Sequence, residues 1–114
     1  MKLNLKSIRE NLSFWKEKGY FLPEFDLEKV RSATVAAPEW IHFGAGNIFR
    51  AFIANSVQGL LNAGYLQKGL IVAEGYDYEI IDRAYQPFDN MCISVTLKVG
   101  VPLKRRLSPA FSKR

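Results

Sequence analysis

The 114-residue sequence is poor in the residues from which metal sites and disulfide frameworks are built. It contains one cysteine and one histidine, Cys92 and His42. A single cysteine cannot form an internal disulfide, and one histidine and one distant cysteine cannot close a metal site. We therefore expect no metal and a reducing compartment. Cys92 lies in an alternating apolar run, which predicts a thiol packed in a strand.

Long hydrophobic runs are also missing. No apolar stretch approaches the roughly 20 residues that span a bilayer, so we expect no membrane partner. The N-terminus mixes lysines with apolar residues and lacks the apolar core of a signal peptide, which predicts a cytoplasmic protein. The chain is long enough for one modest core, and 48% hydrophobic residues argue against disorder.

The positive charge is confined to one end of the chain. The net charge is +5, yet residues 1–98 carry eleven basic and eleven acidic side chains, and the excess follows Lys98. A neutral body with a basic tail is not a basic binding face, so we expect no nucleic-acid partner. Residues 99–114 also contain two prolines and no sustained periodicity, which predicts a basic, disordered tail.

Apolar spacing predicts alternating helices and strands in the remainder. The predicted elements are, in order, a helix over Asn4–Lys18 ending at Gly19, a short helix capped by Asp26 and reaching about Ser32, a loop over 33–38, a strand over Trp40–Phe43, a helix from Ile48 to about Ala63, a buried strand over Gly69–Ala73, a helix over Tyr78–Tyr85 and a strand over Met91–Lys98.

The segment from Trp40 to Ala73 determines the predicted fold class. It reads as strand, helix and buried strand within about the 30 residues of a right-handed parallel crossover. The fold class predicted is α/β, an incomplete Rossmann-type parallel sheet with an N-terminal helical leader. The predicted organisation is a leader at 1–38, a partial nucleotide-binding domain at 39–98 and the tail at 99–114.

A Gly-Ala-Gly turn between the first predicted strand and its helix is the main functional signal. Gly44 allows a tight turn, and Gly46 lets the backbone approach a pyrophosphate at the start of the helix. The usual dinucleotide pattern is G-x-G-x-x-G, and here Phe49 occupies the third glycine position. We expect its ring to hold the helix away from the sheet or to turn into a neighbouring pocket.

Two acidic residues follow the second predicted strand, where a dinucleotide site places the carboxylate that binds the ribose hydroxyls. Glu74 comes directly after Ala73, and Asp77 follows three residues later. The alternative for Glu74 is a solvated carboxylate, and for Asp77 a helix N-cap. A carboxylate here favours NAD over NADP, because it would repel a 2′-phosphate.

The helix after the turn begins with two polar candidates. Arg50 lies in its first turn, where a cation opposes the helix dipole and predicts an anionic partner. That partner is either the pyrophosphate or a carboxylate such as Glu39. Asn47 either caps the helix or contacts phosphate. His42, within the preceding strand, is predicted to be a partnered structural histidine rather than a catalytic one.

The run Trp-Ile-His-Phe-Gly-Ala-Gly-Asn-Ile-Phe-Arg-Ala-Phe-Ile-Ala resembles the N-terminal signature of the long-chain mannitol dehydrogenase family. That family includes mannitol 2-dehydrogenases, mannitol-1-phosphate 5-dehydrogenases, and fructuronate and tagaturonate reductases. Its glycine motif reads G-x-G-x-x-x-R, to which Phe49 and Arg50 conform. The resemblance covers about residues 2–98.

The resemblance implies hydride transfer between NAD(H) and a mannitol- or mannonate-type alcohol or ketone. It implies that Gly44, Gly46, Asn47 and Arg50 surround the pyrophosphate. It also implies that the Glu74 or Asp77 carboxylate faces the adenosine ribose, and that a small polyol or sugar acid is the substrate of the complete enzyme.

Family members take their catalytic lysine and its assisting residues from a later helical domain. This sequence does not contain that domain, so no catalytic residue is assigned. We expect the 114 residues alone to be inactive. The abrupt charge shift after Lys98 suggests a frameshifted tail.

Two other interpretations stay open. The glycine turn could serve a small module that holds a mononucleotide, or it could merely shape a turn. The chain could also associate with other chains through an exposed sheet edge.

Overall fold

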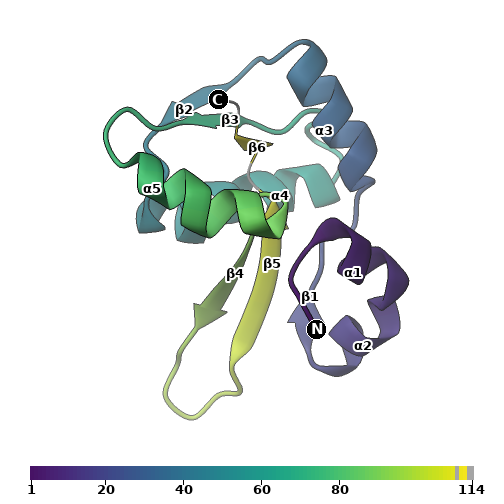
Figure 1. Ribbon diagram of the computed structural model, residues 1–114. Coiled ribbons are helices and arrows are strands. Elements are labelled where there is room, and N and C mark those ends of the chain that lie inside the picture. Colours follow the sequence, from purple (N-terminus) through teal and green to yellow (C-terminus); the bar gives the residue numbers. More distant parts are fainter. Residues whose placement is uncertain (110, 113–114) are drawn as a thin grey trace.

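The computed structural model describes residues 1–109 and 111–112, in which three parallel strands form one sheet (Figure 1). Strand β2 (Ile41–Phe43) pairs with β3 (Ile71–Ala73), and β3 pairs in turn with β6 (Phe111–Ser112). The order β2-β3-β6 corresponds to one half of a doubly wound sheet, so the predicted parallel α/β fold is confirmed. Within the described residues β2 has a partner on one side only, and it forms an edge of this sheet.

One continuous helix connects β2 to β3, as predicted. It consists of a π-helical turn, η1 (Phe49–Ile53), followed directly by α4 (Ala54–Asn62). After β3 the chain forms α5 (Tyr78–Ile80), a second π turn η2 (Ile81–Tyr85) and a 3-10 turn η3 (Gln86–Phe88). Single π turns inside helices are often found at functional sites, and here one of them follows the glycine turn.

The N-terminal leader differs from its prediction at two places. The first helix is broken into α1 (Leu5–Glu10) and α2 (Leu12–Glu17), because Asn11 leaves helical geometry and its side-chain amide donates to the Ser7 carbonyl. Helix α3 (Leu27–Ala36) starts at the Asp26 cap as predicted, with the carboxylate accepting from the Lys29 N–H.

Helix α3 also runs four residues further than expected, into the predicted loop. Its buried Thr34 donates to the Val30 carbonyl at 2.6 Å and accepts from the Gly69 N–H at 2.8 Å. This second bond is a tertiary contact with the segment before β3. The buried Thr34 hydroxyl thus has both a donor and an acceptor as partners, which could not be inferred from the sequence around Thr34.

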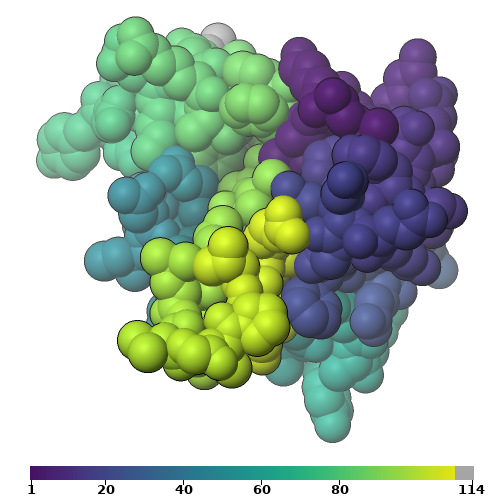
Figure 2. Space-filling model, turned by 90° about the horizontal axis from the view of Figure 1, so that it is seen from below, coloured from purple at the N-terminus to yellow at the C-terminus, as the bar shows by residue number. Residues whose placement is uncertain are grey.

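A second sheet joins the two ends of the chain. Strand β4 (Met91–Thr96) forms an antiparallel hairpin with β5 (Lys104–Pro109), and β5 pairs in parallel with β1 (Tyr20–Phe21) of the leader. Figure 2 shows this hairpin lying against the N-terminal part of the chain. The strand predicted at residues 91–98 is therefore present, but it belongs to this second sheet.

The prediction of a disordered tail is wrong for residues 104–109. Leu107 and Ser108 are fully buried, and the Arg105 guanidinium lies over the Tyr20 ring and donates to the Lys18 carbonyl at 2.7 Å. Residues 110, 113 and 114 of the predicted tail lie outside the described residues. The boundary drawn between a leader at 1–38 and a nucleotide-binding unit at 39–98 stays a prediction.

Two hydrophobic clusters support these sheets. The larger lies between the parallel sheet and its helices and contains Val30, Ala45, Phe49, Ala54, Val57, Leu61, Leu70, Val72, Ile81 and Tyr85. The smaller lies between the leader and the hairpin and contains Ile8, Trp15, Met91 and Leu107. No helix among the described residues is long and apolar enough to cross a bilayer.

Candidate functional site

The Gly-Ala-Gly turn follows β2 directly and lies beside the end of β3. Gly44 has φ +106°, a conformation that residues with a side chain rarely adopt, and its N–H donates to the Ala73 carbonyl at 2.8 Å. Gly46 is exposed, and a Cβ added there would meet no protein atom within 4 Å. The predicted tight turn at Gly44 is thus present, and Gly46 leaves open space on the surface.

Side chains from three other parts of the fold hold Ala45, the buried middle residue of this turn. Its N–H donates to Glu74 Oε2 at 2.9 Å. Its carbonyl accepts from the Tyr85 hydroxyl at 2.8 Å and from Arg50 Nη1 at 3.3 Å. Both backbone groups of a fully buried residue are therefore satisfied by side chains.

Glu74 joins the glycine turn to the turn that follows β3. Its second oxygen, Oε1, accepts from the N–H groups of Gly75, Tyr76 and Asp77 at 3.0, 3.1 and 3.5 Å. These N–H donors, led by that of Ala45, lower the pKa of the Glu74 carboxyl, because they stabilise its charged form. Glu74 is therefore more than a solvated carboxylate at the end of a strand.

We expect Glu74→Gln to destabilise the chain in a pH-dependent way. A carboxyl whose pKa is lowered by folding contributes stability above its ordinary value, here 4.5, and loses it as the pH falls through the folded value. The difference in free energy of unfolding between wild type and variant should thus be largest at neutral pH and shrink on acidification below 4.5.

Urea denaturation of both proteins from pH 7 to pH 3 measures this difference. Glu24→Gln, at an exposed carboxylate outside the glycine turn, is the matched control. A Glu74 difference that stayed constant across the range would contradict the assigned role of its charge.

Asp77 adopts the helix-capping alternative. Its carboxylate accepts from the Ile80 N–H at 3.3 Å and so caps α5. It approaches Glu74 only through its own backbone N–H. The structure therefore separates the two acidic candidates: Glu74 contacts the glycine turn, and the Asp77 side chain is engaged in its own helix.

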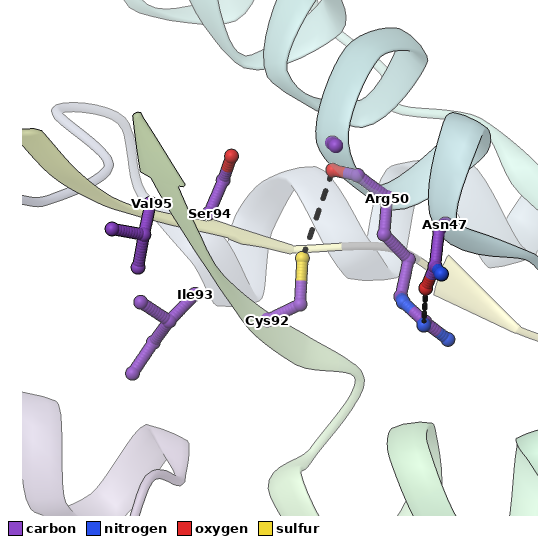
Figure 3. A pocket seen from close by; sticks show the side chains of 7 residues that line it. Asn47, Arg50, Cys92, Ile93, Ser94 and Val95 are labelled. Carbon is purple, nitrogen blue, oxygen red and sulfur yellow. Dashed lines mark hydrogen bonds between the residues drawn. The ribbon is translucent and has the colours of Figure 1, made fainter. Parts of the chain in front are cut away.

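Arg50 and Asn47 lie side by side above a cavity. The Arg50 guanidinium donates to Asn47 Oδ1 as well as to the Ala45 carbonyl. Glu39, the other partner considered for Arg50, is paired with Lys68 instead, at 2.8 Å. Both side chains line a cavity of about 240 Å³, whose other wall is strand β4. Figure 3 shows how these side chains lie opposite the strand.

Cys92 lies in this wall as a packed thiol, as expected. Its Sγ lies 3.8 Å from the Arg50 carbonyl and 3.3 Å from Ser108 Oγ. Burial raises the pKa of the Cys92 thiol, so the group stays protonated and a poor nucleophile. Among the described residues no group of three or more His, Cys, Asp or Glu side chains could hold a metal ion.

Phe49 turns inward rather than displacing the helix. Its side chain is 2% exposed, and its ring stacks on His42 with the centroids 4.9 Å apart. His42 is thus in contact with a core aromatic ring, as expected for a structural histidine. The large residue in the motif fills the space between β2 and the following helix.

Tyr85 is a further residue of the site that the sequence does not single out, and its hydroxyl reaches Ala45 from 40 residues away. In the sequence it is one aromatic among many, shortly before Pro87, and no local pattern marks it. Burial raises the pKa of Tyr85 to about 12, so at neutral pH the hydroxyl is a donor to the Ala45 carbonyl.

Two known proteins are similar to this chain, while no family model matches it. The D-mannonate oxidoreductase of Thermotoga maritima is 42% identical over 107 residues, which is 94% of this chain and 20% of that protein. The solved Pseudomonas fluorescens mannitol 2-dehydrogenase, in a ternary complex with NAD and D-mannitol, is 20% identical. It matches with a TM-score of 0.71 over 99% of this chain and 22% of its own.

These matches confirm the resemblance in sequence and in fold. The chain spans about a fifth of the length of each protein. The match to the Thermotoga maritima protein covers 107 of the 114 residues. Even if it begins at residue 1, it must therefore continue past Lys98, at least to residue 107. The family resemblance therefore extends further than predicted, and the idea of an out-of-frame tail beginning after Lys98 is wrong.

Proposed function

This chain is a partial-length relative of the mannitol dehydrogenase family, and from that premise we propose that it is the NAD-binding segment of an oxidoreductase acting on a CH–OH group. The observation that carries the proposal is the turn at Gly44–Gly46, located where β2 ends in a parallel sheet. In such sheets ligands bind beyond the carboxyl ends of the strands. The exposed backbone of Gly46 is open to an approaching group.

The residues around this turn fit two parts of a dinucleotide, the anionic pyrophosphate and the hydroxyls of the adenosine ribose. Gly44 and Gly46 shape the backbone near the pyrophosphate, and Asn47 and Arg50 supply polar donors beside it. Two hydrogen bonds use only part of the Arg50 guanidinium, which has five N–H donors. The carboxylate of Glu74 or of Asp77 would accept from the ribose hydroxyls; Glu74 already accepts backbone N–H groups of the glycine turn and of its own turn, and Asp77 accepts one from α5.

The bound NAD would supply the hydride acceptor or donor of the reaction. By the names of the two relatives, the substrate of the complete enzyme is a small polyol or sugar acid of the mannitol or mannonate type. This segment holds the cofactor and has no assigned catalytic residue, so we expect no turnover by it alone. We also propose that the protein works in the cytoplasm.

We expect saturable binding of NAD to the purified chain, with weaker binding of NADP and AMP. Gly46→Ala should weaken NAD binding by about tenfold or more, because the added methyl group takes the space of the ligand. The same change should barely affect folding, since no protein atom lies within 4 Å of the new Cβ. Isothermal titration of wild type and variant with the three nucleotides measures this.

Gly59→Ala is the control, because its Cβ also meets no protein atom but lies in α4 away from the turn. It should leave NAD binding unchanged. Equal affinity for NAD and AMP would favour a mononucleotide module. Absence of binding by a folded chain would contradict the proposal and leave the motif as a structural turn.

Self-association is the second proposed function, and it rests on an apolar surface near the edge strand. Phe43 on β2 is 82% exposed, and Ile48, just after the glycine turn, is 79% exposed. Exposed apolar side chains beside a strand edge that has no partner within the described residues favour association with another chain. Sedimentation over a range of concentrations decides this, and a constant monomer mass would contradict it.

A further inference from the structure

The shortest side-chain hydrogen bond to Ala45, at the centre of the glycine turn, comes from Tyr85. This residue lies at the end of η2, its side chain is 2% exposed, and its hydroxyl donates to the Ala45 carbonyl at 2.8 Å. The second donor to that carbonyl, Arg50 Nη1, is longer at 3.3 Å. Tyr85 also lies under the Arg50 guanidinium, 5.7 Å from ring centre to Cζ.

The direction of the Ala45 carbonyl determines the direction of the next N–H. In a trans peptide the C=O of one residue and the N–H of the next point to opposite sides, and the described chain contains no cis peptide bond. Because the Ala45 carbonyl points to the buried Tyr85 hydroxyl, the Gly46 N–H points away from it. Gly46 is exposed, and its N–H has no backbone acceptor within the described residues.

We propose that Tyr85 is a positioning residue of the nucleotide site: its hydroxyl orients the Ala45–Gly46 peptide so that the Gly46 N–H faces an oxygen of a bound diphosphate. This inference rests on the proposed function of the turn. The orientation exists before a ligand arrives, so binding does not have to reorganise the peptide. Glu74 supports the same geometry from the other side, by accepting the Ala45 N–H.

The phenol is well suited to this task. A buried hydroxyl meets little competition from water, and the aromatic ring that carries it belongs to the main hydrophobic cluster, which restricts its movement. The raised pKa of Tyr85 keeps the proton on the oxygen throughout the physiological range. Arg50 alone would hold the carbonyl through a longer bond from a flexible, partly exposed side chain.

The test is Tyr85→Phe, which removes the hydroxyl and keeps the ring in the core. We expect NAD and ADP to bind about three- to tenfold more weakly, as for the loss of one hydrogen bond. Adenosine, which lacks the diphosphate, should bind within about twofold of wild type. In amide NMR spectra of the ligand-free chain, the Gly46 N–H signal should shift. Tyr65→Phe, at an exposed tyrosine, is the matched control.

The outcomes separate this inference from the proposed function. If wild type binds NAD and ADP and Tyr85→Phe binds them equally well, the inference is overturned while the proposed function stands. Equal weakening for adenosine and ADP would show a general loss of structure and also overturns it. If wild type binds neither NAD nor ADP, the nucleotide role falls together with the proposed function. An unchanged Gly46 signal in Tyr85→Phe would refute the orienting role by itself.

Discussion

Leu107→Ala should lower the free energy of unfolding by about 2–5 kcal/mol, the usual cost of truncating a buried leucine. Leu107 lies on β5, is fully buried, and packs in the smaller hydrophobic cluster with Ile8, Trp15 and Met91. Removing three carbon atoms there leaves a cavity between the leader and the hairpin. The effect would be large for a chain of this size, whose total stability is of the order of 10 kcal/mol.

Urea denaturation of wild type and variant measures this loss. Leu103→Ala is the matched control, since Leu103 lies just before β5 and is 55% exposed. It should change the stability by no more than about 0.5 kcal/mol. Equal, small effects of both substitutions would contradict the docking of this segment onto the leader and would restore the expectation of a disordered tail.

Phe49→Ala should cost about 3–5 kcal/mol of stability, although it brings the motif closer to the common dinucleotide pattern. The substitution places a small residue at the third glycine position. In this fold, however, the ring is 2% exposed, belongs to the larger cluster and stacks on His42. In other nucleotide-binding folds a small residue at this position lets the helix pack directly against the sheet. Here the Phe49 ring fills the space between the helix and β2.

Ile48→Ala is the control for this prediction. The two residues are adjacent and both apolar, but Ile48 is 79% exposed and should contribute no more than about 0.5 kcal/mol. Thermal and urea unfolding of the pair provide the comparison. A stability of Phe49→Ala close to that of wild type would mean that the helix can move onto the sheet and close the gap.

The contrast between Phe49 and Ile48 shows the limit of reading apolar periodicity. The predicted helix is present, and Val57 and Leu61 are buried as a helical stripe requires. Phe52, an apolar residue of the same continuous helix, is 63% exposed. The spacing of apolar residues predicts the helix, but it does not predict which of those residues are buried in the folded chain.

Features that depend only on neighbouring residues are predictable from the linear sequence. The turn at Gly44 needs a residue free to adopt positive φ, and the Asp26 carboxylate caps α3 within its own first turn. The continuous apolar run predicts a buried strand over Gly69–Ala73, and the structure contains it as Ile71–Ala73. Each of these signals acts over a few residues, so a linear pattern is sufficient to reveal it.

The hydrogen-bond partners of the polar groups around the turn depend on how the chain folds as a whole. The sequence offers both Glu74 and Asp77 for the ribose hydroxyls, but only the Glu74 side chain accepts from the Ala45 N–H, across a separation of 29 residues. The hydrogen bond from Tyr85 to the same residue spans 40 residues, and β5 pairs with β1 of the leader across more than 80 residues. Such contacts require donor and acceptor to come within hydrogen-bond distance at a suitable angle. The packing of the whole chain determines this, and no periodic pattern in the sequence indicates it.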